Sequence, residues 1–428
     1  MNRAVLGAVL AVLLGQFSAP ALALDSCDTG CIASEPNPNG TCHQETSFKD
    51  WQSGVMADAI NAGVSTGTLT AAIRCICYNP KFIRSDANQG ATFQGTWLDW
   101  LTTHKVDGRV LPAARVLKQK AGLFQQIEAK YGVPGAVLVT FWSFETSFGA
   151  DKGKLSSISA STTLAYDCRR ADEMRKNLID DLLLLDKGPL GPDQMIGSWA
   201  GEMGHFQMMP QVIKDFGQDG DGDGRVDVIN SMPDAMATAA KYLQSLGWEP
   251  GQPWLEEVRV PAQMDWRYAD FNEVLTRSQW HSLGVVQSAD GQLADDNVQA
   301  ALFLPMGHLG PAFLVYNNFL KGFMGWNKSW NYSLSLAYLA NRIDAVMTTG
   351  NANAGMLSLA NGAPESLASY NDIYELQQRL IAHQWLEGTA DGQIGPATRD
   401  AARKAQVQLR LPADGYPDEV LLRKLRGI

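Results

Sequence analysis

The sequence lacks the short motifs that mark two common enzyme classes. It contains no His-Glu-x-x-His pair and no phosphate-binding Gly-Lys-Ser/Thr loop. The first motif places two zinc ligands on one helix face, and the second surrounds a phosphate with backbone amides. Zinc hydrolysis and nucleotide use therefore find no support.

Long apolar runs and excess basic charge are missing as well. After residue 23, no stretch approaches the ~20 apolar residues that a transmembrane helix needs. The chain carries 35 Lys and Arg against 45 Asp and Glu, a net charge of −10. Nucleic acid binds through a basic surface that releases counterions. We therefore expect no membrane span and no nucleic-acid partner, and a largely uncharged polymer fits better.

The start of the chain has the pattern of an export signal. A basic Arg3, the apolar run 4–17 and the small residues before Ala23 predict an export signal over residues 1–23, cleaved near Ala23, and a periplasmic protein. Asp25 is wrong for a lipoprotein box, so lipid anchoring is not expected.

Cysteine is sparse and confined to the first part of the chain. An even number of cysteines in an exported chain predicts disulfides, whose pairing the sequence leaves open. The six are Cys27, Cys31, Cys42, Cys75, Cys77 and Cys168.

A carboxylate occupies the apolar stripe of a predicted helix. Leu138, Phe141, Trp142, Glu145 and Phe148 follow the spacing of a helix face that packs on a core. Burial of a charged carboxylate is costly, so such a group holds its proton tightly, finds a cation or lines a cleft. A proton donor to a leaving group needs that environment. A purely structural glutamate is the alternative, with about equal weight at this point.

Helical periodicity dominates the chain. We expect helices at residues 113–131, 134–149, 164–185, 203–216, 233–246 and 333–347. Short β-branched segments at 257–260, 281–287, 299–304 and 312–316 predict a small sheet. The fold class is therefore mainly α (α+β). Residues 348–368 are typical of a linker, and about three short helices follow it. We find no internal repeat.

Two segments combine small, polar and aromatic residues. In Gly197–Pro210, Ser198 and Gln207 could hydrogen-bond sugar hydroxyls or amides. In Trp326–Tyr332, aromatic rings could stack on sugar faces and Asn327 stands at a helix entrance. Each segment taken alone is better explained as a tight loop or an aromatic helix cap.

Residues 219–234 reproduce most of a calcium-loop pattern. Acidic residues stand at positions 1, 3, 5 and 9, with Gly at 6 and an apolar residue at 8. Position 12 is Asn230 where a bidentate Glu is usual, and Asp234 could supply that carboxylate. We expect a structural Ca²⁺ over an empty, solvated turn.

These segments together resemble a known family, the B-type lytic murein transglycosylases. The resemblance covers about residues 47–347, because five motifs and a Phe48-x-x-Trp51 start occur in that family's order and spacing. The motifs are Glu145–Gly149, Thr163–Arg170, Gly197–Pro210, the Asp219 loop and Trp326–Tyr332.

The resemblance implies a lysozyme-like helical catalytic region at 47–347, with a small β subdomain at about 255–316. It also implies cleavage of the MurNAc-β-1,4-GlcNAc bond of peptidoglycan to 1,6-anhydroMurNAc ends by a single catalytic Glu145, which acts as acid and then as base. The implied sugar-site residues are Ser198, Gln207, Asn327 and Tyr332. The implied metal-site residues are Asp219, Asp221, Asp223, Arg225, Asp227 and Asp234, and no organic cofactor is implied.

The last unit, residues 369–428, resembles the small peptidoglycan-binding domain of many wall enzymes. The resemblance rests on Leu376-Gln377-x-x-Leu380, Asp391 to Thr398 and Leu411 to Gly415. The cysteine-containing residues 24–46 are not part of either pattern. Glycan strands of peptidoglycan are thus the expected partner, and the sequence does not reveal which cell-wall synthesis or secretion machinery recruits the chain.

Three other functions compete with this interpretation. A lysozyme-type muramidase would cut the same bond with water, and most glycosidases use a second carboxylate for that purpose. Asp151 and Glu202 are acids near the motifs, but the sequence does not place them in space. A non-catalytic wall-binding protein and a calcium-dependent structural protein are the remaining alternatives.

Overall fold

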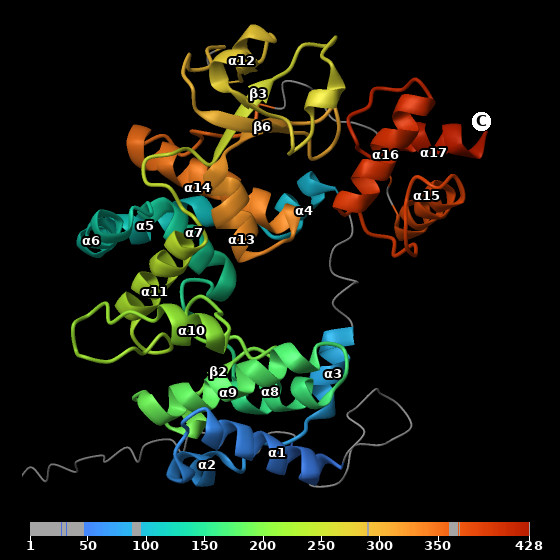
Figure 1. Cartoon of the computed structure of the whole chain (residues 1–428). Coiled ribbons are helices and arrows are strands. Elements are labelled where there is room, and N and C mark those ends of the chain that lie inside the picture. The colour runs from blue at the N-terminus through green and yellow to red at the C-terminus, as the bar shows by residue number, and fades with distance from the viewer. Residues whose placement is uncertain are drawn as a thin grey trace, which may run out of the picture.

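The computed structural model describes Cys27, Cys31, Leu367 and residues 47–87, 96–288, 291–358 and 369–427. The expected export signal and much of the expected linker lie outside these residues. Helices predominate, and a small sheet stands at one end of the helical body (Figure 1). Sequence and structure therefore agree on a mainly α fold with a minor β part.

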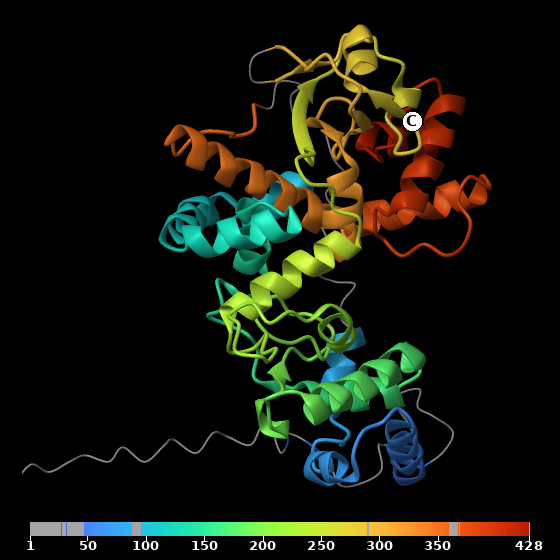
Figure 2. The same ribbon diagram turned by 60° about the vertical axis from the view of Figure 1, so that its left-hand side comes forward.

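The first half of the chain is almost entirely helical. Its helices and short strands are α1 (Phe48–Asn61), α2 (Thr66–Ala72), α3 (Pro80–Ala87), α4 (Trp97–Thr103), η2 (Asp107–Arg109), α5 (Val110–Gln119), α6 (Ala121–Tyr131), α7 (Gly135–Thr146), β1 (Leu155–Ser156), α8 (Ser157–Tyr166), α9 (Ala171–Lys187), η3 (Pro192–Gln194), β2 (Ile196–Gly197), α10 (Pro210–Phe216) and α11 (Met232–Ser245). Helices α1, α2 and α3 pack on α8 and α9 at one end of the molecule (Figures 1 and 2). Helix α7 lies further along, in contact with α5, α6, α11 and α14.

An antiparallel sheet forms the opposite end of the body. Its strand order is β4-β6-β7-β3-β5. The elements of this half are β3 (Leu255–Arg259), η4 (Trp266–Tyr268), β4 (Val274–Thr276), α12 (Arg277–Ser282), β5 (Val286–Gln287), β6 (Gln299–Phe303), β7 (Ala312–Val315), η5 (Asn318–Phe323), α13 (Met324–Trp326) and α14 (Trp330–Thr349). One face of the sheet buries Val258, Leu302 and Leu314 against Trp280 in a core of its own. The chain then returns to the helical body through α14, which contacts α7 and α5.

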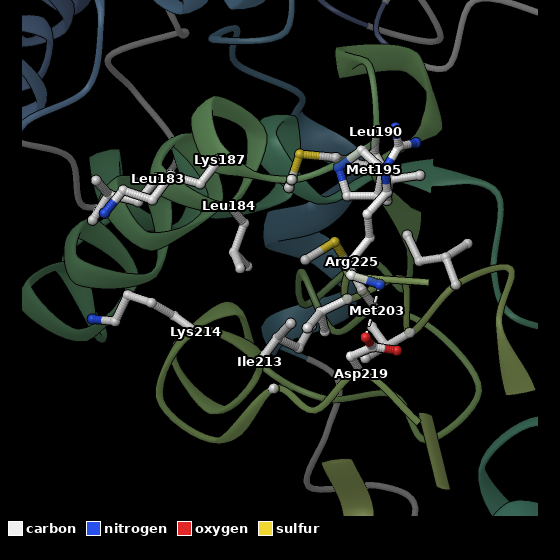
Figure 3. A pocket seen from close by; sticks show the side chains of 17 residues that line it. Leu183, Leu184, Lys187, Leu190, Met195, Met203, Ile213, Lys214, Asp219 and Arg225 are labelled. Carbon is white, nitrogen blue, oxygen red and sulfur yellow. Dashed lines mark hydrogen bonds between the residues drawn. The ribbon is translucent and has the colours of Figure 1, made fainter. Parts of the chain in front are cut away.

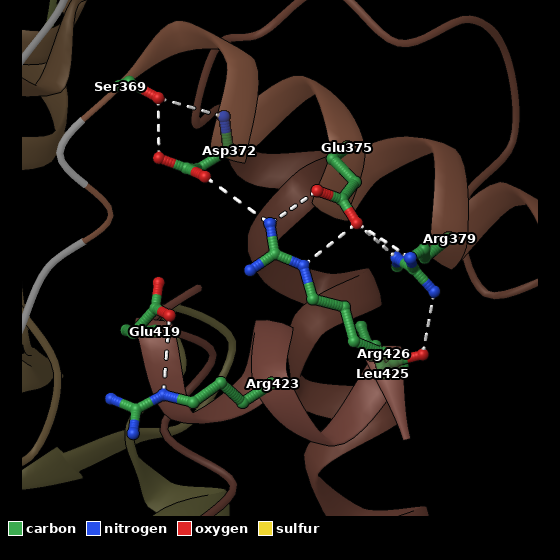
Figure 4. A network of polar contacts seen from close by, with 8 residues as sticks. All are labelled: Ser369, Asp372, Glu375, Arg379, Glu419, Arg423, Leu425 and Arg426. Atoms are coloured by element: carbon green, nitrogen blue, oxygen red, sulfur yellow. Dashed lines mark hydrogen bonds and ion pairs between the residues drawn. The ribbon is translucent and has the colours of Figure 1, made fainter. Parts of the chain in front are cut away.

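Three helices form the C-terminal unit: α15 (Tyr370–Ala382), α16 (Pro396–Gln408) and α17 (Glu419–Arg426). They enclose a separate apolar core that includes Leu376, Leu380 and Leu421. On the surface, Glu375 accepts hydrogen bonds from Arg379 on its own helix and from Arg426 on α17 (Figure 4). These two guanidinium groups lower the pKa of Glu375 to about 2. The Arg426 contact ties the last helix of the unit to the first.

Two buried glutamines close two similar turns of this unit. The side-chain amide of Gln377 donates to Asp391 Oδ1 at 2.7 Å, and its carbonyl accepts from the backbone N–H of Gly392 at 2.7 Å. The side chain of Gln406 donates to Asp414 Oδ1 at 2.8 Å and accepts from Gly415 N–H at 2.8 Å. Each Asp-Gly pair follows an alanine, so a weak repeat that our sequence analysis missed is present here.

The C-terminal unit packs against the sheet end of the body. Arg399 donates to the backbone carbonyls of Leu304 and Pro305 at 3.1 and 2.7 Å, and Arg403 pairs with Asp270 at 2.6 Å. Asp414 accepts from both the backbone and the ring of His308. Figure 1 shows α16 next to the sheet. Directed polar contacts therefore hold the unit in one orientation.

Disulfides join the N-terminal cysteines to the segment between α2 and α3. Cys27 pairs with Cys75 and Cys31 pairs with Cys77, and Cys168 is also disulfide-bonded. The expectation of structural disulfides is thus confirmed for these five cysteines. Among the described residues, no helix is both long and apolar enough to cross a membrane.

Several predicted elements differ from the observed ones. The single helix expected at 113–131 is broken at Lys120, which lets α5 pack on α14 while α6 packs on α11. The helix expected at 164–185 begins only at Ala171, because α8 ends at Tyr166. The helix expected at 203–216 begins only at Pro210. The strand expected at 281–287 is mostly α12 and a turn, with only β5 extended.

We predict that Gln377→Leu destabilises the C-terminal unit. The change leaves the buried N–H of Gly392 without its partner, which costs about 1–3 kcal/mol per unsatisfied group. Calorimetry of the full chain should show a lower melting temperature for this unit. Gln378→Leu on the exposed side of the same helix is the control and should have little effect. Equal melting of the two variants would contradict the bracing role of Gln377.

Candidate active site

Helix α7 carries Glu145 at the end of a segment that is buried on nearly all sides. The helix begins after Pro134, whose fixed backbone suits a helix start. It ends in three successive left-handed residues, Ser147, Phe148 and Gly149, with φ of 50°, 62° and 82°. Non-glycine residues rarely adopt this conformation, so the surroundings must hold the turn in place. Glu145 itself keeps partial solvent exposure.

Contacts to the loop around His205 fix this turn. The Thr146 hydroxyl donates to the His205 carbonyl at 2.8 Å, and the indole N–H of Trp142 donates to His205 Nδ1 at 3.0 Å. Burial lowers the pKa of His205 to about 4, with a smaller contribution from Lys152. The ring is therefore neutral at pH 7, and its Nδ1 accepts a hydrogen bond from the Trp142 indole N–H. The loop and the end of α7 thus form one rigid corner.

Burial dominates the ionisation of Glu145. Desolvation raises the pKa of Glu145 to about 8, and the negative charge of Glu202 acts in the same direction. Hydrogen bonds from Tyr332 and Trp326 oppose the shift by stabilising the carboxylate. The hydroxyl of Tyr332, in the first turn of α14, donates a hydrogen bond to Glu145 Oε1. The group is thus mostly protonated at neutral pH but has partners ready for its charged form.

The loop between β2 and α10 brings the two predicted polar residues of that segment into place. Ser198 donates its hydroxyl to Glu202 Oε2 at 2.9 Å. Gln207 adopts a φ of 45° and donates its amide to the carbonyls of Lys152 and Gly204 at 3.2 and 2.9 Å. Gln207 therefore stabilises the loop through its N–H groups, and neither of these bonds uses its carbonyl.

Asn327 and Tyr332 flank the start of α14. Asn327 is exposed, and its side-chain oxygen accepts from the backbone N–H of Ser329 at 2.9 Å. Ser329 caps α14 in turn, which orients Tyr332 toward Glu145. The ring of Trp326 lies 4.5 Å from that of Phe141, centroid to centroid. Aromatic packing thus joins this segment to α7.

Sequence analysis named Glu202 but could not place it beside Glu145. The two carboxylates, with Tyr332, are close enough to influence one another electrostatically. The signal was an acid within a segment of small residues, Gly197–Pro210. Only the fold of the loop shows which way that acid faces. The other acid that the sequence analysis named, Asp151, accepts a hydrogen bond from the backbone N–H of Gly153 in the turn after α7.

The acidic loop before α11 gathers carboxylates as its pattern predicts. Ligand oxygens of Asp219, Asp221 and Asp223 all lie within 4.8 Å of one another. Within the described ranges, none of these three carboxylates forms a salt bridge with a lysine or arginine side chain. Asp234 is buried and braces the loop, because its two oxygens accept from the N–H groups of Gly220 and Asp227 at 2.8 Å each.

A cavity of about 720 Å³ lies between α9, α10 and this acidic loop (Figure 3). Leu184, Ile213 and Met203 contribute apolar lining, and Asp219 and Arg225 belong to its rim on the loop side. None of Glu145, Ser198, Gln207 or Tyr332 lines this space. The cavity is therefore distinct from the site around Glu145.

Comparison with family models identifies both parts of the chain. Residues 47–341 match the transglycosylase SLT domain. The chain belongs to this family. Residues 369–425 match a putative peptidoglycan binding domain. The lysozyme-like fold and the C-terminal unit expected from sequence are thereby confirmed, and Glu145 lies within the matched catalytic range.

Solved structures of relatives cover nearly the whole chain. SltB3 from Pseudomonas aeruginosa, in complex with NAG-anhNAM-pentapeptide, superposes with a TM-score of 0.80 at 33% identity, over 89% of this chain and 99% of that one. The same protein in complex with NAG-NAM-pentapeptide gives 0.79 at 34% identity. The Escherichia coli lytic transglycosylase Slt35 in complex with calcium gives 0.57 at 23% identity over 70% of this chain and 94% of that one, which shows likeness of fold.

A curated relative matches a shorter stretch. Membrane-bound lytic murein transglycosylase B of Escherichia coli (strain K12) is 32% identical over 122 residues. That stretch is 28% of this chain and spans about a third of the relative, 34% of its length.

Proposed function

We propose that the protein is a lytic transglycosylase that cleaves the MurNAc-β-1,4-GlcNAc bond of peptidoglycan and leaves 1,6-anhydroMurNAc ends. The observation that carries this proposal is the environment of Glu145. The carboxyl is desolvated, is mostly protonated at neutral pH, remains partly exposed and has Tyr332 and Trp326 as partners for its charged form. The relative SltB3 bound to NAG-anhNAM-pentapeptide supports this substrate class.

In the first step, Glu145 donates its proton to the glycosidic oxygen. The bond from that oxygen to C1 of MurNAc breaks, GlcNAc leaves with the proton, and positive charge develops at C1. Burial assists this step because it keeps the acid protonated near the working pH. The hydrogen bond from Tyr332 to Glu145 is already in place and would stabilise the negative charge as it forms.

In the second step, the Glu145 carboxylate takes the proton from the C6 hydroxyl of the same MurNAc. The C6 oxygen attacks C1 and closes the anhydro ring, so Glu145 ends protonated and no water is consumed. The nucleophile belongs to the bound substrate and is already close to C1, which lowers the entropic part of the barrier. One carboxyl therefore suffices for both proton transfers.

Four side chains would line the sugar site around this acid: Ser198, Gln207, Asn327 and Tyr332. They come from the loop between β2 and α10 and from the segment that begins α14, and each has a polar atom for a hydroxyl or acetamido group. The C-terminal unit would bind glycan strands and keep the enzyme on its polymer. Disulfide-bonded cysteines support an exported, periplasmic protein, because disulfides persist in oxidising compartments.

A structural Ca²⁺ would suit the acidic loop. Three gathered carboxylates repel one another, and oxygen ligands are those that calcium prefers. Asp219, Asp221, Asp223 and Asp227 would hold the ion, with Arg225 at position 7 of the loop and Asp234 behind it. Bound calcium would offset the repulsion and stabilise the loop. The calcium complex of Slt35 supports the proposal.

The product test separates this proposal from its alternatives. Purified sacculi treated with the protein should release muropeptides that mass spectrometry finds one water lighter than reducing-end products. Glu145→Gln keeps the shape but removes the acid and base, so the rate should fall by on the order of 10²–10⁴ or more. Glu128→Gln, an exposed change on α6, should act like wild type.

Reducing ends in place of anhydro ends would favour a lysozyme-type muramidase. Digestion by Glu145→Gln at the wild-type rate would remove Glu145 from the chemistry. A wild-type protein that binds sacculi without cutting them would be a wall-binding module.

The raised pKa of Glu145 predicts an alkaline limit to activity. The acid form predominates below pH 8 and is lost above it, so kcat/KM should fall as pH rises through about 8. The folded state also binds this proton more tightly than the unfolded chain does, so this group weakens folding as pH rises from 4.5 to about 8. Melting curves at each pH therefore serve as the control. A profile that stays flat to pH 10 in a folded enzyme would contradict the assignment.

Removal of calcium should lower the thermal stability of the catalytic region and should not act directly on the proton transfers of Glu145. Chelation by EDTA is expected to lower the melting temperature of the catalytic region by about 5 °C, and added Ca²⁺ should restore it. Asp221→Asn should weaken this response, whereas Asp215→Asn, an exposed acid outside the loop, should not. A melting temperature indifferent to both EDTA and Ca²⁺ would rule out the ion.

A further inference from the structure

A second carboxylate stands in the site beside the acid proposed above. Glu202 lies in the loop after β2, and its backbone carbonyl accepts from Ser198 N–H at 2.9 Å. Its side-chain Oε2 accepts a hydrogen bond from the Ser198 hydroxyl, with the two oxygens 2.9 Å apart. Ser198 and Glu202 are therefore joined twice, once through the main chain and once through their side chains.

The loop geometry leaves this pair little freedom. A Cβ on Gly197 would overlap the Glu202 carbonyl, so only glycine permits this approach of the two strands of the loop. Gly201 has a φ of 88°, and its carbonyl accepts from the buried Ser157 hydroxyl at 2.8 Å. Met203 then pairs with Met208 in an isolated antiparallel bridge. The backbone thus sets the position of Glu202 on both sides.

The hydrogen bonds determine what Ser198 can offer to a ligand. A serine hydroxyl has one proton and two lone pairs. Glu202 takes the proton, and the N–H of Ala200 occupies one lone pair at 3.1 Å. The hydroxyl is left with one acceptor position, strengthened by the carboxylate behind it. Ser198 can therefore accept from a sugar N–H or O–H.

Four ionisable groups act on one another here. Burial raises the pKa of Glu202, while the Ser198 hydrogen bond and the positive charge of Arg170 oppose the shift. Glu202 in turn repels the charged forms of Glu145 and Tyr332. A negative Glu202 makes loss of the Glu145 proton harder. The side chain of Glu202 itself accepts a hydrogen bond from Ser198.

We propose that Glu202 is a positioning residue that fixes Ser198 as a hydrogen-bond acceptor for a donor group of the bound sugar. The inference rests on the proposed function. It assigns to this chain a specific recognition of an N–H or O–H group at the cleaved sugar.

Two substitutions test this role. Glu202→Gln keeps an oxygen that can accept from Ser198, so it should lose less kcat/KM than Glu202→Ala does. Glu202→Ala also frees the Ser198 proton, and kcat/KM should fall by about tenfold. Because Glu202 acts through Ser198, the variant Ser198→Ala with Glu202→Ala should lose little more than Ser198→Ala alone.

Ser157→Ala is the structural control. It releases the same loop from α8 without a change at Ser198 or Glu202, so it should lower the melting temperature without the tenfold fall in kcat/KM. The inference is overturned if Glu202→Gln loses as much kcat/KM as Glu202→Ala, or if the Ser198→Ala and Glu202→Ala losses multiply independently. Failure of the wild-type protein to release anhydro products would instead overturn the proposed function.

Discussion

The placement of one ionisable side chain at the end of a buried helix constrains most of the surrounding structure. Glu145 needs an environment dry enough to keep its proton, yet open enough to reach a polymer. Helix α7 supplies the dryness because α5, α6, α11 and α14 surround it. The left-handed turn that follows ends the helix one residue after the acid.

Sequence patterns located the elements whose ends carry their own signals. Helices α11 and α14 lie within about three residues of their predicted bounds, and Ser231 and Ser329 cap them. The apolar stripe that contains Glu145 also identified the central helix. The break at Lys120 had no such signal, since neighbouring helices decide it. The same holds for residues 203–209, which the left-handed Gly204 and a backbone bridge between Met203 and Met208 keep out of a helix.

The site shows a similar division. Local motifs named Glu145, Ser198, Gln207 and Tyr332, because each sits in a recognisable segment. Their mutual placement depends on contacts 60 to almost 190 residues apart, such as Thr146 with His205 and Glu145 with Tyr332, which no local pattern contains. Cysteine pairing belongs to the same class, because composition announces crosslinks but only the fold selects partners.

The paired glutamine turns of the C-terminal unit have a consequence of their own. Gln377 and Gln406 each close one Asp-Gly turn with a single side chain, so the same residue pattern forms the same turn at two places in the unit. The second copy also faces the body, where Asp414 contacts His308. Among the residues that the structure describes, no hydrogen bond joins the Asp391 turn to the body. Partial opening of the unit should therefore start at the Asp391 turn, so that hydrogen exchange is faster there than at its twin.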